Sequence, residues 1–313
     1  MHTRRKKTMK NILIIGGSYF AGKILVEELV KEKELNIFIY NRGNRPLSKD
    51  SVTELVGDRS DITRIKEVIP PNNWDAVIDF CAYTPMDIET MIDAIPGQVN
   101  HYIYISTTTI YEETVDLPVK EDALTLSGPD PQLGQYSDYG YNKWLAECKL
   151  KEKCKAKQIT YTVLRPAIIY GEYNYAPRES YFFDLIQNDK TLILPDNELP
   201  LFSFVYVVDV ANIIKKSISN DKVYNETFNI AAKEMISYKR LIEVFREITG
   251  KTITTKRMNA AMIDKKGIPL PFPLDHHLLY SGDKISRVLD FTYTPFTTGM
   301  KNTYEYYQLT LNR

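Results

Sequence analysis

Residues 11–22 read NILIIGGSYFAG, and this stretch decides the fold. It starts with an apolar run, residues 12–15, whose length and β-branched composition are typical of a buried parallel strand. Gly16 and Gly17 follow directly, and residues 21–30 then carry one apolar stripe at helical spacing. The stretch therefore predicts a strand, a tight glycine turn and an amphipathic helix in immediate succession.

The same alternation continues along the chain. Further short runs rich in β-branched or aromatic residues occur at 37–40, 76–79, 102–105, 160–164 and 227–230. Strands that alternate with helices build a parallel sheet with helices on both faces. The sequence therefore predicts an α/β protein with a Rossmann-type doubly wound parallel sheet and a smaller C-terminal α+β substrate lobe.

The amino-acid composition changes after about residue 170, where prolines and aromatic residues become frequent. One amphipathic helix stands out there, with Ser237 as its N-cap and Gly250 as its stop. The predicted division gives the dinucleotide-binding domain residues 9–170 plus about 202–232. It gives the substrate-binding lobe about 171–201 plus 233–313, and leaves 1–8 as a tail.

Composition excludes several classes of function. The 313 residues include 40 basic and 40 acidic side chains, so the formal net charge is zero. A protein whose main task is to bind a polyanion carries a basic excess, so we expect no nucleic-acid partner. The basic cluster at residues 4–7 precedes Met9 and is interpreted as part of the tail.

The cysteines, the histidines and an apolar run near the N-terminus limit the cellular compartment, the metal chemistry and the membrane association that the sequence predicts. Its three cysteines do not suit a disulfide framework, and a reducing cytoplasm is expected. The four histidines show no metal-ligand spacing, so no metal site is predicted. The apolar run at residues 12–15 is far shorter than the roughly 20 residues of a membrane span, so we expect no membrane partner.

The glycine turn indicates phosphate binding. Gly16 and Gly17 allow a tight turn and a close backbone approach to a pyrophosphate, and Gly22 allows close packing of helix on strand. Phosphates would then lie at the N-terminus of the helix. A turn with a purely structural role is the alternative.

The end of the second predicted strand, Tyr40-Asn41-Arg42-Gly43, indicates which dinucleotide is bound. NAD-preferring dehydrogenases normally place a carboxylate there for the ribose hydroxyl, and none is present. Arg42, with Arg45 as a second candidate, could instead pair with a 2′-phosphate. The sequence therefore favours NADP(H), with NAD(H) as the alternative. Asp58, after a third short strand, could contact the adenine or could be a turn residue.

Tyr139 and Lys143 place a phenol and an ammonium at i and i+4 on one helix face. About two such pairs are expected by chance in this composition, and the chain has three, so the spacing alone decides nothing. The upstream strand at 102–105 ends in the hydroxyl run 106–109. Open α/β sheets bind ligands at this end of their strands, which favours Tyr139 and Lys143 over the other pairs.

At these motifs the chain resembles the extended short-chain dehydrogenase/reductases, the family of NAD-dependent epimerases and dehydratases that includes nucleotide-sugar epimerases, dehydratases and reductases. GGSYFAG resembles an atypical GGxxFxG form of its glycine loop, with Tyr19 at the usual middle glycine. The other matching segments, in chain order, are VIDFCA, STTTIY, YGYNK, LRPAIIYG and FVYVVDVA.

The resemblance implies that Tyr139 is the general acid/base, Lys143 its partner and ribose anchor, and Thr107 the hydroxyl that orients the substrate. A nearby ammonium would stabilise the phenolate of a tyrosine whose free pKa is about 10. The cofactor-binding residues it implies are Gly16, Gly17, Tyr19, Phe20, Gly22, Asn41, Arg42, Asp58, Arg59, Phe80, Cys81, Ala82, Lys143 and Pro166.

Departures from the family pattern narrow the predicted reaction. Thr108 and Thr109 stand where 4,6-dehydratases carry Asp-Glu, so dehydration is disfavoured. Phe202 stands where an arginine often binds the substrate diphosphate, and Arg178 or Lys256 could replace that cation. The predicted substrate-side residues are therefore Thr108, Thr109, Arg178 and Phe202.

The leading hypothesis is an NAD(P)-dependent oxidoreductase or epimerase, with epimerase or ketoreductase favoured over dehydratase. Its substrate would be a sugar-like small molecule, with a nucleotide sugar among the candidates. The alternatives are a non-catalytic NADP-binding regulator and an RNA-binding protein, since the glycine loop also resembles chloroplast stem-loop-binding proteins. The resemblance also implies a homodimer, although Trp144, Leu145 and Cys148 suit a core as well as an interface.

Overall fold

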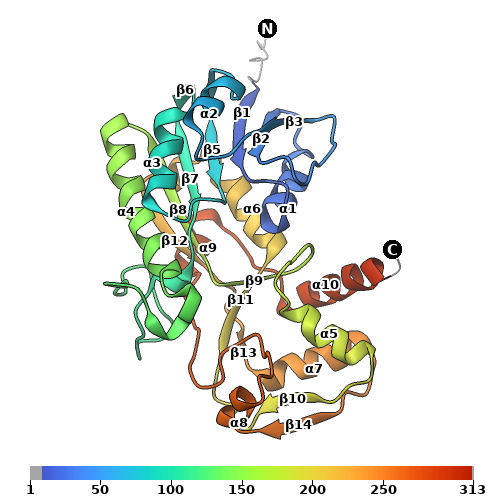
Figure 1. The fold of residues 1–313 in the computed structure, drawn as a ribbon. Helices are drawn as coiled ribbons and strands as arrows, with labels where there is room; N and C mark the ends of the chain where they lie inside the picture. The colour runs from blue at the N-terminus through green and yellow to red at the C-terminus, as the bar shows by residue number, and fades with distance from the viewer. Residues whose placement is uncertain (1–8, 312–313) are drawn as a thin grey trace.

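The computed structural model describes residues 9–311, apart from the side chains of Gln132 and Leu133. The tail predicted for residues 1–8 lies outside the described residues. A seven-stranded sheet forms the upper part of the molecule in Figure 1. Its strands are β1 (Lys10–Ile15), β2 (Leu35–Asn41), β3 (Val52–Val56), β5 (Ala76–Asp79), β7 (His101–Ile105), β8 (Thr160–Pro166) and β12 (Glu226–Ile230).

All neighbouring strands of this sheet pair in parallel, in the order β12-β8-β7-β5-β1-β2-β3. The chain proceeds from β1 to one edge and then returns to β5 on the other side of β1. The sheet is therefore doubly wound, as predicted, and its ligand crevice is expected at the carboxyl ends of β1 and β5.

Side-chain alternation along β1 explains why both faces of the sheet are covered. Ile12 and Ile14 belong to one hydrophobic core, and Leu13 and Ile15 belong to the other. One face is covered by α1 (Phe20–Leu29) and α6 (Val207–Ser217), which pack together, and the other by α3 (Pro85–Ala94) and α4 (Tyr139–Lys157). Smaller elements of this part are α2 (Ile62–Val68), β4 (Asn72–Trp74), β6 (Gly97–Val99) and the 3-10 turns Thr108–Ile110, Pro131–Tyr136 and Asp221–Val223.

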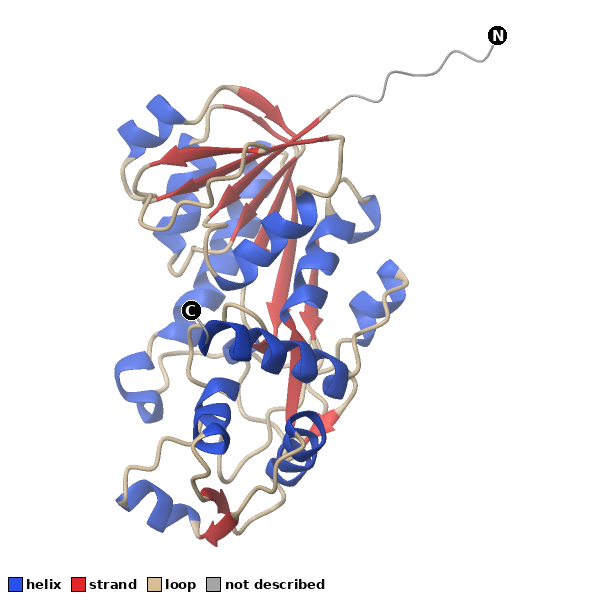
Figure 2. Cartoon of the chain, turned by 90° about the vertical axis from the view of Figure 1, so that its right-hand side faces the viewer, coloured by secondary structure: helices blue, strands red, loops and turns tan. Residues whose placement is uncertain are grey.

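A second lobe lies below the sheet, and Figure 2 shows it from the side as helices and loops with short strands. Its sheets are β9 (Ile168–Tyr170) with β11 (Phe202–Tyr206) and β13 (Met235–Ile236), and β10 (Leu192–Pro195) with β14 (Thr255–Met258). Its helices are α5 (Glu179–Gln187), α7 (Tyr238–Thr249), α8 (Ala260–Lys265) and α10 (Phe296–Leu311). The predicted α7 is confirmed, because the Ser237 side chain accepts from Arg240 N and Gly250 ends the helix at φ +65°.

Two segments differ from the predicted domain division. β11 pairs with β9 and β13 and lies outside the seven-stranded sheet. Conversely, α9 (Asp283–Leu289) packs on β12 and α6, although the second lobe was predicted to contain it. Within residues 9–311, no helix has both the length and the apolar character needed to cross a membrane.

Candidate active site

The glycine turn lies at the carboxyl end of β1, where the strand order reverses. Gly16 and Gly17 have φ values of +104° and +82°, which residues with a side chain rarely adopt. A Cβ on Gly22 would lie 2.9 Å from the Cα of Gly17, so helix and turn touch as predicted. No side chain caps α1, so its first N–H groups remain available to phosphate oxygens. The turn therefore fits a dinucleotide.

Aromatic side chains gather beside this turn. The ring of Tyr19 stacks on that of Tyr175 with 5.0 Å between centroids, and the guanidinium of Arg45 packs on Tyr19 at 3.9 Å. Phe20, with φ +40°, contacts the edge of Tyr175. Tyr175 comes from the segment between β9 and α5, so the stack joins the glycine turn to the second lobe.

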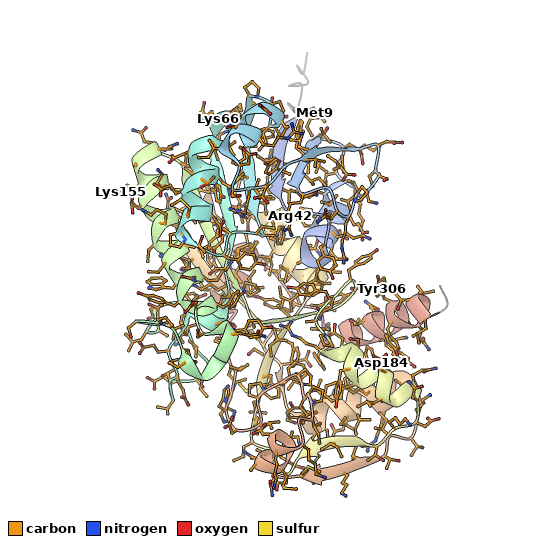
Figure 3. The ribbon with its side chains drawn as sticks, viewed as in Figure 1. Met9, Arg42, Lys66, Lys155, Asp184 and Tyr306 are labelled. Atoms are coloured by element: carbon orange, nitrogen blue, oxygen red, sulfur yellow. The ribbon has the colours of Figure 1, made fainter. Side chains whose placement is uncertain are left out.

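The end of β2 presents Asn41 and Arg42 at the same edge of the sheet. The Asn41 side chain accepts from Gly43 N at 2.7 Å and donates to Gly16 O at 3.4 Å, which ties β2 to the turn. Arg42 is exposed and lies between the sheet and the second lobe (Figure 3). The Asp58 carboxylate accepts from Ser60 N and Oγ, as a turn residue does, so its position accords with the structural alternative.

Arg59 is bound to protein groups. Its guanidinium donates to both carboxylate oxygens of Asp79 at 3.0 Å, and it also contacts Asp87. Burial would raise the pKa of Asp79, but the charge and hydrogen bonds of Arg59 hold it below its usual value. Because the guanidinium of Arg59 is already paired with Asp79 and Asp87, a cofactor would have to compete with these carboxylates for the predicted contact.

The loop after β5 contains the predicted cofactor residues Phe80, Cys81 and Ala82. The N–H groups of Cys81 and Ala82 donate to Asp79 Oδ1 at 2.8 and 3.0 Å. A Cβ on Gly16 would lie 2.9 Å from Cys81 Sγ, so this loop borders the glycine turn. Burial raises the pKa of the Cys81 thiol to about 11, which keeps this wall of the site uncharged near neutral pH.

Lys143 is buried on α4, and its ammonium donates to the carbonyl oxygens of Ala82 at 2.9 Å and Ile105 at 2.7 Å. The ammonium also lies 4.3 Å from the ring centroid of Tyr104. Burial lowers the pKa of Lys143 to about 8. The ammonium is therefore predominantly charged at neutral pH and has one of its three N–H donors left for a ligand.

Tyr139 lies one turn before Lys143 at the start of α4 and is 37% exposed. Burial raises the pKa of its phenol, while a hydrogen bond with Thr107 and the charge of Arg178 lower it. The Thr107 hydroxyl also accepts from Thr109 N at 3.1 Å. The structure thus brings together the three predicted catalytic residues, which come from two separate segments.

The predicted substrate residues Thr108, Thr109 and Arg178 differ in exposure and in their hydrogen-bond partners. Thr109 is exposed, with its hydroxyl 3.0 Å from that of Thr107, whereas Thr108 is buried and donates to Pro166 O at 3.4 Å. Arg178 precedes α5 and donates to Ile169 O at 3.0 Å. Arg178 is therefore the predicted cation that reaches the surroundings of Tyr139.

The structure corrects two further predictions about the substrate site, because Phe202 and Lys256 both lie away from it. Phe202 is fully buried and packs against Tyr238 and Phe272 in the core of the second lobe, so it has no surface to offer a substrate. Phe202 begins strand β11, but its side chain faces the core. Lys256 is exposed on β14, at the end of the second lobe away from the glycine turn (Figure 1).

The sequence reasoning missed a buried network below Lys143. Glu147 pairs with Arg165 at 2.6 Å and accepts from the Ser106 hydroxyl at 2.6 Å. The signal was available, because Tyr139, Lys143 and Glu147 follow one another at i, i+4 spacing on one helix face. The same reasoning missed Tyr175, which no sequence pattern connects with the glycine turn. Within residues 9–311, no cluster of three or more His, Cys, Asp or Glu side chains is arranged to hold a metal.

The doubly wound sheet, the glycine turn and the Tyr139–Lys143 helix together define a Rossmann-fold protein of the extended short-chain dehydrogenase/reductase type. The model of the NAD dependent epimerase/dehydratase family matches residues 12–231. This match covers more than half of the chain, and the protein belongs to that family.

Similar proteins are known from sequence and from structure. The chain is 26% identical over 256 residues to the chloroplast stem-loop binding protein of 41 kDa b of Arabidopsis thaliana, covering 77% of this chain but 64% of that relative's length. It is 22% identical to UDP-glucose 4-epimerase of Corynebacterium glutamicum, covering 77% of this chain and 81% of the relative.

The structure of UDP-glucose 4-epimerase from Thermotoga maritima, with UDP-glucose, superposes with a TM-score of 0.76 at 20% identity, covering 96% of this chain and 99% of that one. The structure of UDP-glucuronic acid 4-epimerase from Bacillus cereus, with UDP-glucuronic acid and NAD, superposes with a TM-score of 0.75 at 18% identity. The match covers 96% of this chain and 99% of that one. At these identities, the likeness to solved structures concerns the fold.

Proposed function

We propose that this protein is an NAD(P)-dependent oxidoreductase or epimerase that acts on a sugar-like hydroxyl or keto group held between the two lobes. The observation that carries the proposal is the hydrogen bond of Tyr139 with Thr107, one helical turn from the buried ammonium of Lys143, at the sheet edge that also holds a glycine turn that fits a dinucleotide. A regulator that only senses a cofactor has no use for this acid/base group.

The residues divide the chemistry between them. A bound nicotinamide would supply hydride transfer. Tyr139 exchanges a proton with the reacting oxygen, and Thr107 orients that oxygen through its hydroxyl. Lys143 holds a ribose hydroxyl with its remaining donor, and the charge of Arg178 favours the phenolate of Tyr139.

The hydroxyl residues beside Thr107 favour epimerisation or ketone reduction over 4,6-dehydration. Elimination of water needs an acid and a base near the sugar, and threonine hydroxyls at 108 and 109 supply neither near neutral pH. The names of the two epimerase neighbours support a nucleotide sugar as the substrate class. Arg178 would then meet its anionic part, since its charge already acts on the surroundings of Tyr139.

The end of β2 supports NADP(H) as the cofactor. Asn41 is uncharged and does not repel a 2′-phosphate, and exposed Arg42 stands next to it. Hydrogen bonds from Ser60 and the charge of Arg42 lower the pKa of Asp58, and the exposed guanidinium of Arg42 could also pair with a phosphate. NAD(H) remains the alternative, in keeping with the description of the family.

RNA binding is a second candidate, because one relative is named for stem-loop binding. The zero net charge opposes it, since affinity for RNA rests on basic side chains. A gel-shift assay with a stem-loop RNA at several salt concentrations separates the two. Sequence-selective binding that persists at 150 mM salt would favour the RNA-binding candidate.

The test of the leading proposal begins with fluorescence titration of the purified protein with NADPH and NADH. We expect saturable binding of at least one of them. UDP-glucose, UDP-glucuronic acid and UDP-N-acetylglucosamine are then incubated with the protein and the cofactor, and the sugars are analysed by NMR for inversion or reduction. Binding of neither dinucleotide would refute the proposal.

A further inference from the structure

The buried carboxylate of Asp79 accepts hydrogen bonds from two side chains and from two backbone N–H groups. Arg59 donates two at 3.0 Å, and the Tyr102 hydroxyl donates one at 2.6 Å. Two more come from the N–H groups of Cys81 and Ala82. Asp79 is fully buried, and an unpaired charge there would be costly, so the ion pair with Arg59 keeps it ionised.

The loop fixed by Asp79 leads directly to the catalytic lysine. The Ala82 N–H points to Asp79, and the Ala82 carbonyl accepts from Lys143 Nζ at 2.9 Å and from the Tyr104 hydroxyl at 3.0 Å. One peptide segment therefore joins the carboxylate to the ammonium. A shift of this segment would move an acceptor that holds Lys143 in place.

We propose that Asp79, anchored by Arg59, is a positioning residue for Lys143: it fixes the Ala82 loop that holds the ammonium and keeps a negative charge close to it. This inference rests on the proposed function, because it assumes that Lys143 serves the cofactor and Tyr139. In this role Arg59 holds Asp79 and does not touch the cofactor itself. The family resemblance implies a direct contact between Arg59 and the cofactor.

The charges around Lys143 agree with this role. Burial opposes the ammonium and lowers its pKa to about 8, and Asp79 is the foremost charge that acts in the other direction. Glu147 and Cys81 also favour the ammonium, and Arg59 opposes it. The rings of Tyr83 and Tyr104 complete its surroundings, with Nζ 5.4 and 4.3 Å from their centroids.

The role can be separated from a purely structural one by direct titration of Lys143. Protein with 13C-labelled lysine is titrated by NMR without substrate or cofactor, and Lys143→Arg identifies the signal. We expect a midpoint near 8 in the unaltered protein and a lower midpoint in Asp79→Asn, because a neighbouring carboxylate stabilises the ammonium. The matched control is Asp93→Asn on α3, whose carboxylate is 42% exposed and pairs with Lys153.

Equal Lys143 midpoints in Asp79→Asn and Asp93→Asn would overturn the inference, whatever their stabilities. If Asp79→Asn does not fold, Tyr102→Phe replaces it, since this change removes one hydrogen bond to Asp79 and no charge. The amides of Cys81 and Ala82 should then exchange faster with solvent, and unchanged exchange would overturn the inference.

A parallel titration of the unaltered protein with NADPH and NADH separates failure of the proposed function from failure of the role of Asp79. Failure to bind either dinucleotide would refute the proposed function. The effect of Asp79 on the Lys143 midpoint is measured without cofactor and is decided independently.

Discussion

The rings of Tyr19 and Tyr175 stack at 5.0 Å with 18° between their planes, although 155 positions of sequence separate them. Tyr19 occupies the N-cap position of α1, where phosphates are expected, without a capping side-chain hydrogen bond, and Tyr175 belongs to the second lobe. The charge of an ionised Tyr175 would also act on Tyr139. The stack therefore joins the glycine turn to a second-lobe residue that acts on the surroundings of Tyr139.

We expect Tyr175→Ala to weaken binding of the preferred dinucleotide. An aromatic pair contributes about 0.5–1.5 kcal/mol beyond its burial, which corresponds to a roughly twofold to tenfold rise in Kd. Fluorescence titration measures the change. Tyr175→Phe keeps the ring and serves as the control, and equal affinity in the two variants would show that the stack does not hold the cofactor.

Tyr139→Phe should abolish turnover and leave cofactor binding intact. The change removes the proton that the reacting oxygen needs but keeps the ring, and general acid/base catalysis is worth about 10²–10⁴-fold. The measurement is kcat with the substrate identified in the nucleotide-sugar screen. Tyr136→Phe is the control, because Tyr136 is 65% exposed. Undiminished kcat in Tyr139→Phe contradicts the assigned role.

Arg42→Ala should change cofactor preference. Loss of hydrogen bonds to a charged group costs about 1.5–3 kcal/mol, so the Kd for NADPH should rise about tenfold to a hundredfold, while that for NADH stays the same. Lys66→Ala removes a charge on α2, far from Arg42 (Figure 3), and is the control. A parallel loss of NADH affinity would argue against recognition of the 2′-phosphate.

Phe202→Ala should destabilise the protein without affecting the cofactor. Removing a fully buried phenylalanine costs about 3–5 kcal/mol of unfolding free energy. Chemical denaturation measures the loss, and Leu199→Ala, at a side chain 72% exposed, should change little. An unchanged stability with a raised KM would restore the predicted substrate contact.

Acid should destabilise the fold through His101. Its ring is buried, Nε2 lies 2.8 Å from Thr162 Oγ1, and burial lowers its pKa to about 4. Because the unfolded state binds this proton first, stability is present above about pH 6.5 and is lost as pH falls toward 4, by about 3 kcal/mol in all. Comparing unfolding free energies at pH 7.5 and 5.0 with those of His101→Gln isolates this contribution. Parallel losses in both proteins would contradict it.

Local pattern was sufficient for much of this fold. The predicted strands are present, and α7 begins at Ser237 and ends at Gly250 as the capping residues indicate. These features depend on neighbours in sequence. Phe202 shows the limit of such reasoning, because a strand position alone does not tell which face of a small sheet becomes the core.

The sequence by itself determined the class of fold, the glycine turn after the first strand and the placement of Tyr139 and Lys143 on one helix face, because strand composition, glycine conformation and helical spacing act over a few residues. Only the tertiary structure decided that Arg59 pairs with Asp79 and that Tyr175 meets Tyr19. Such contacts arise where parallel strands and a second lobe bring distant segments to one edge of the sheet. Their formation depends on burial and charge in three dimensions, which no local pattern records.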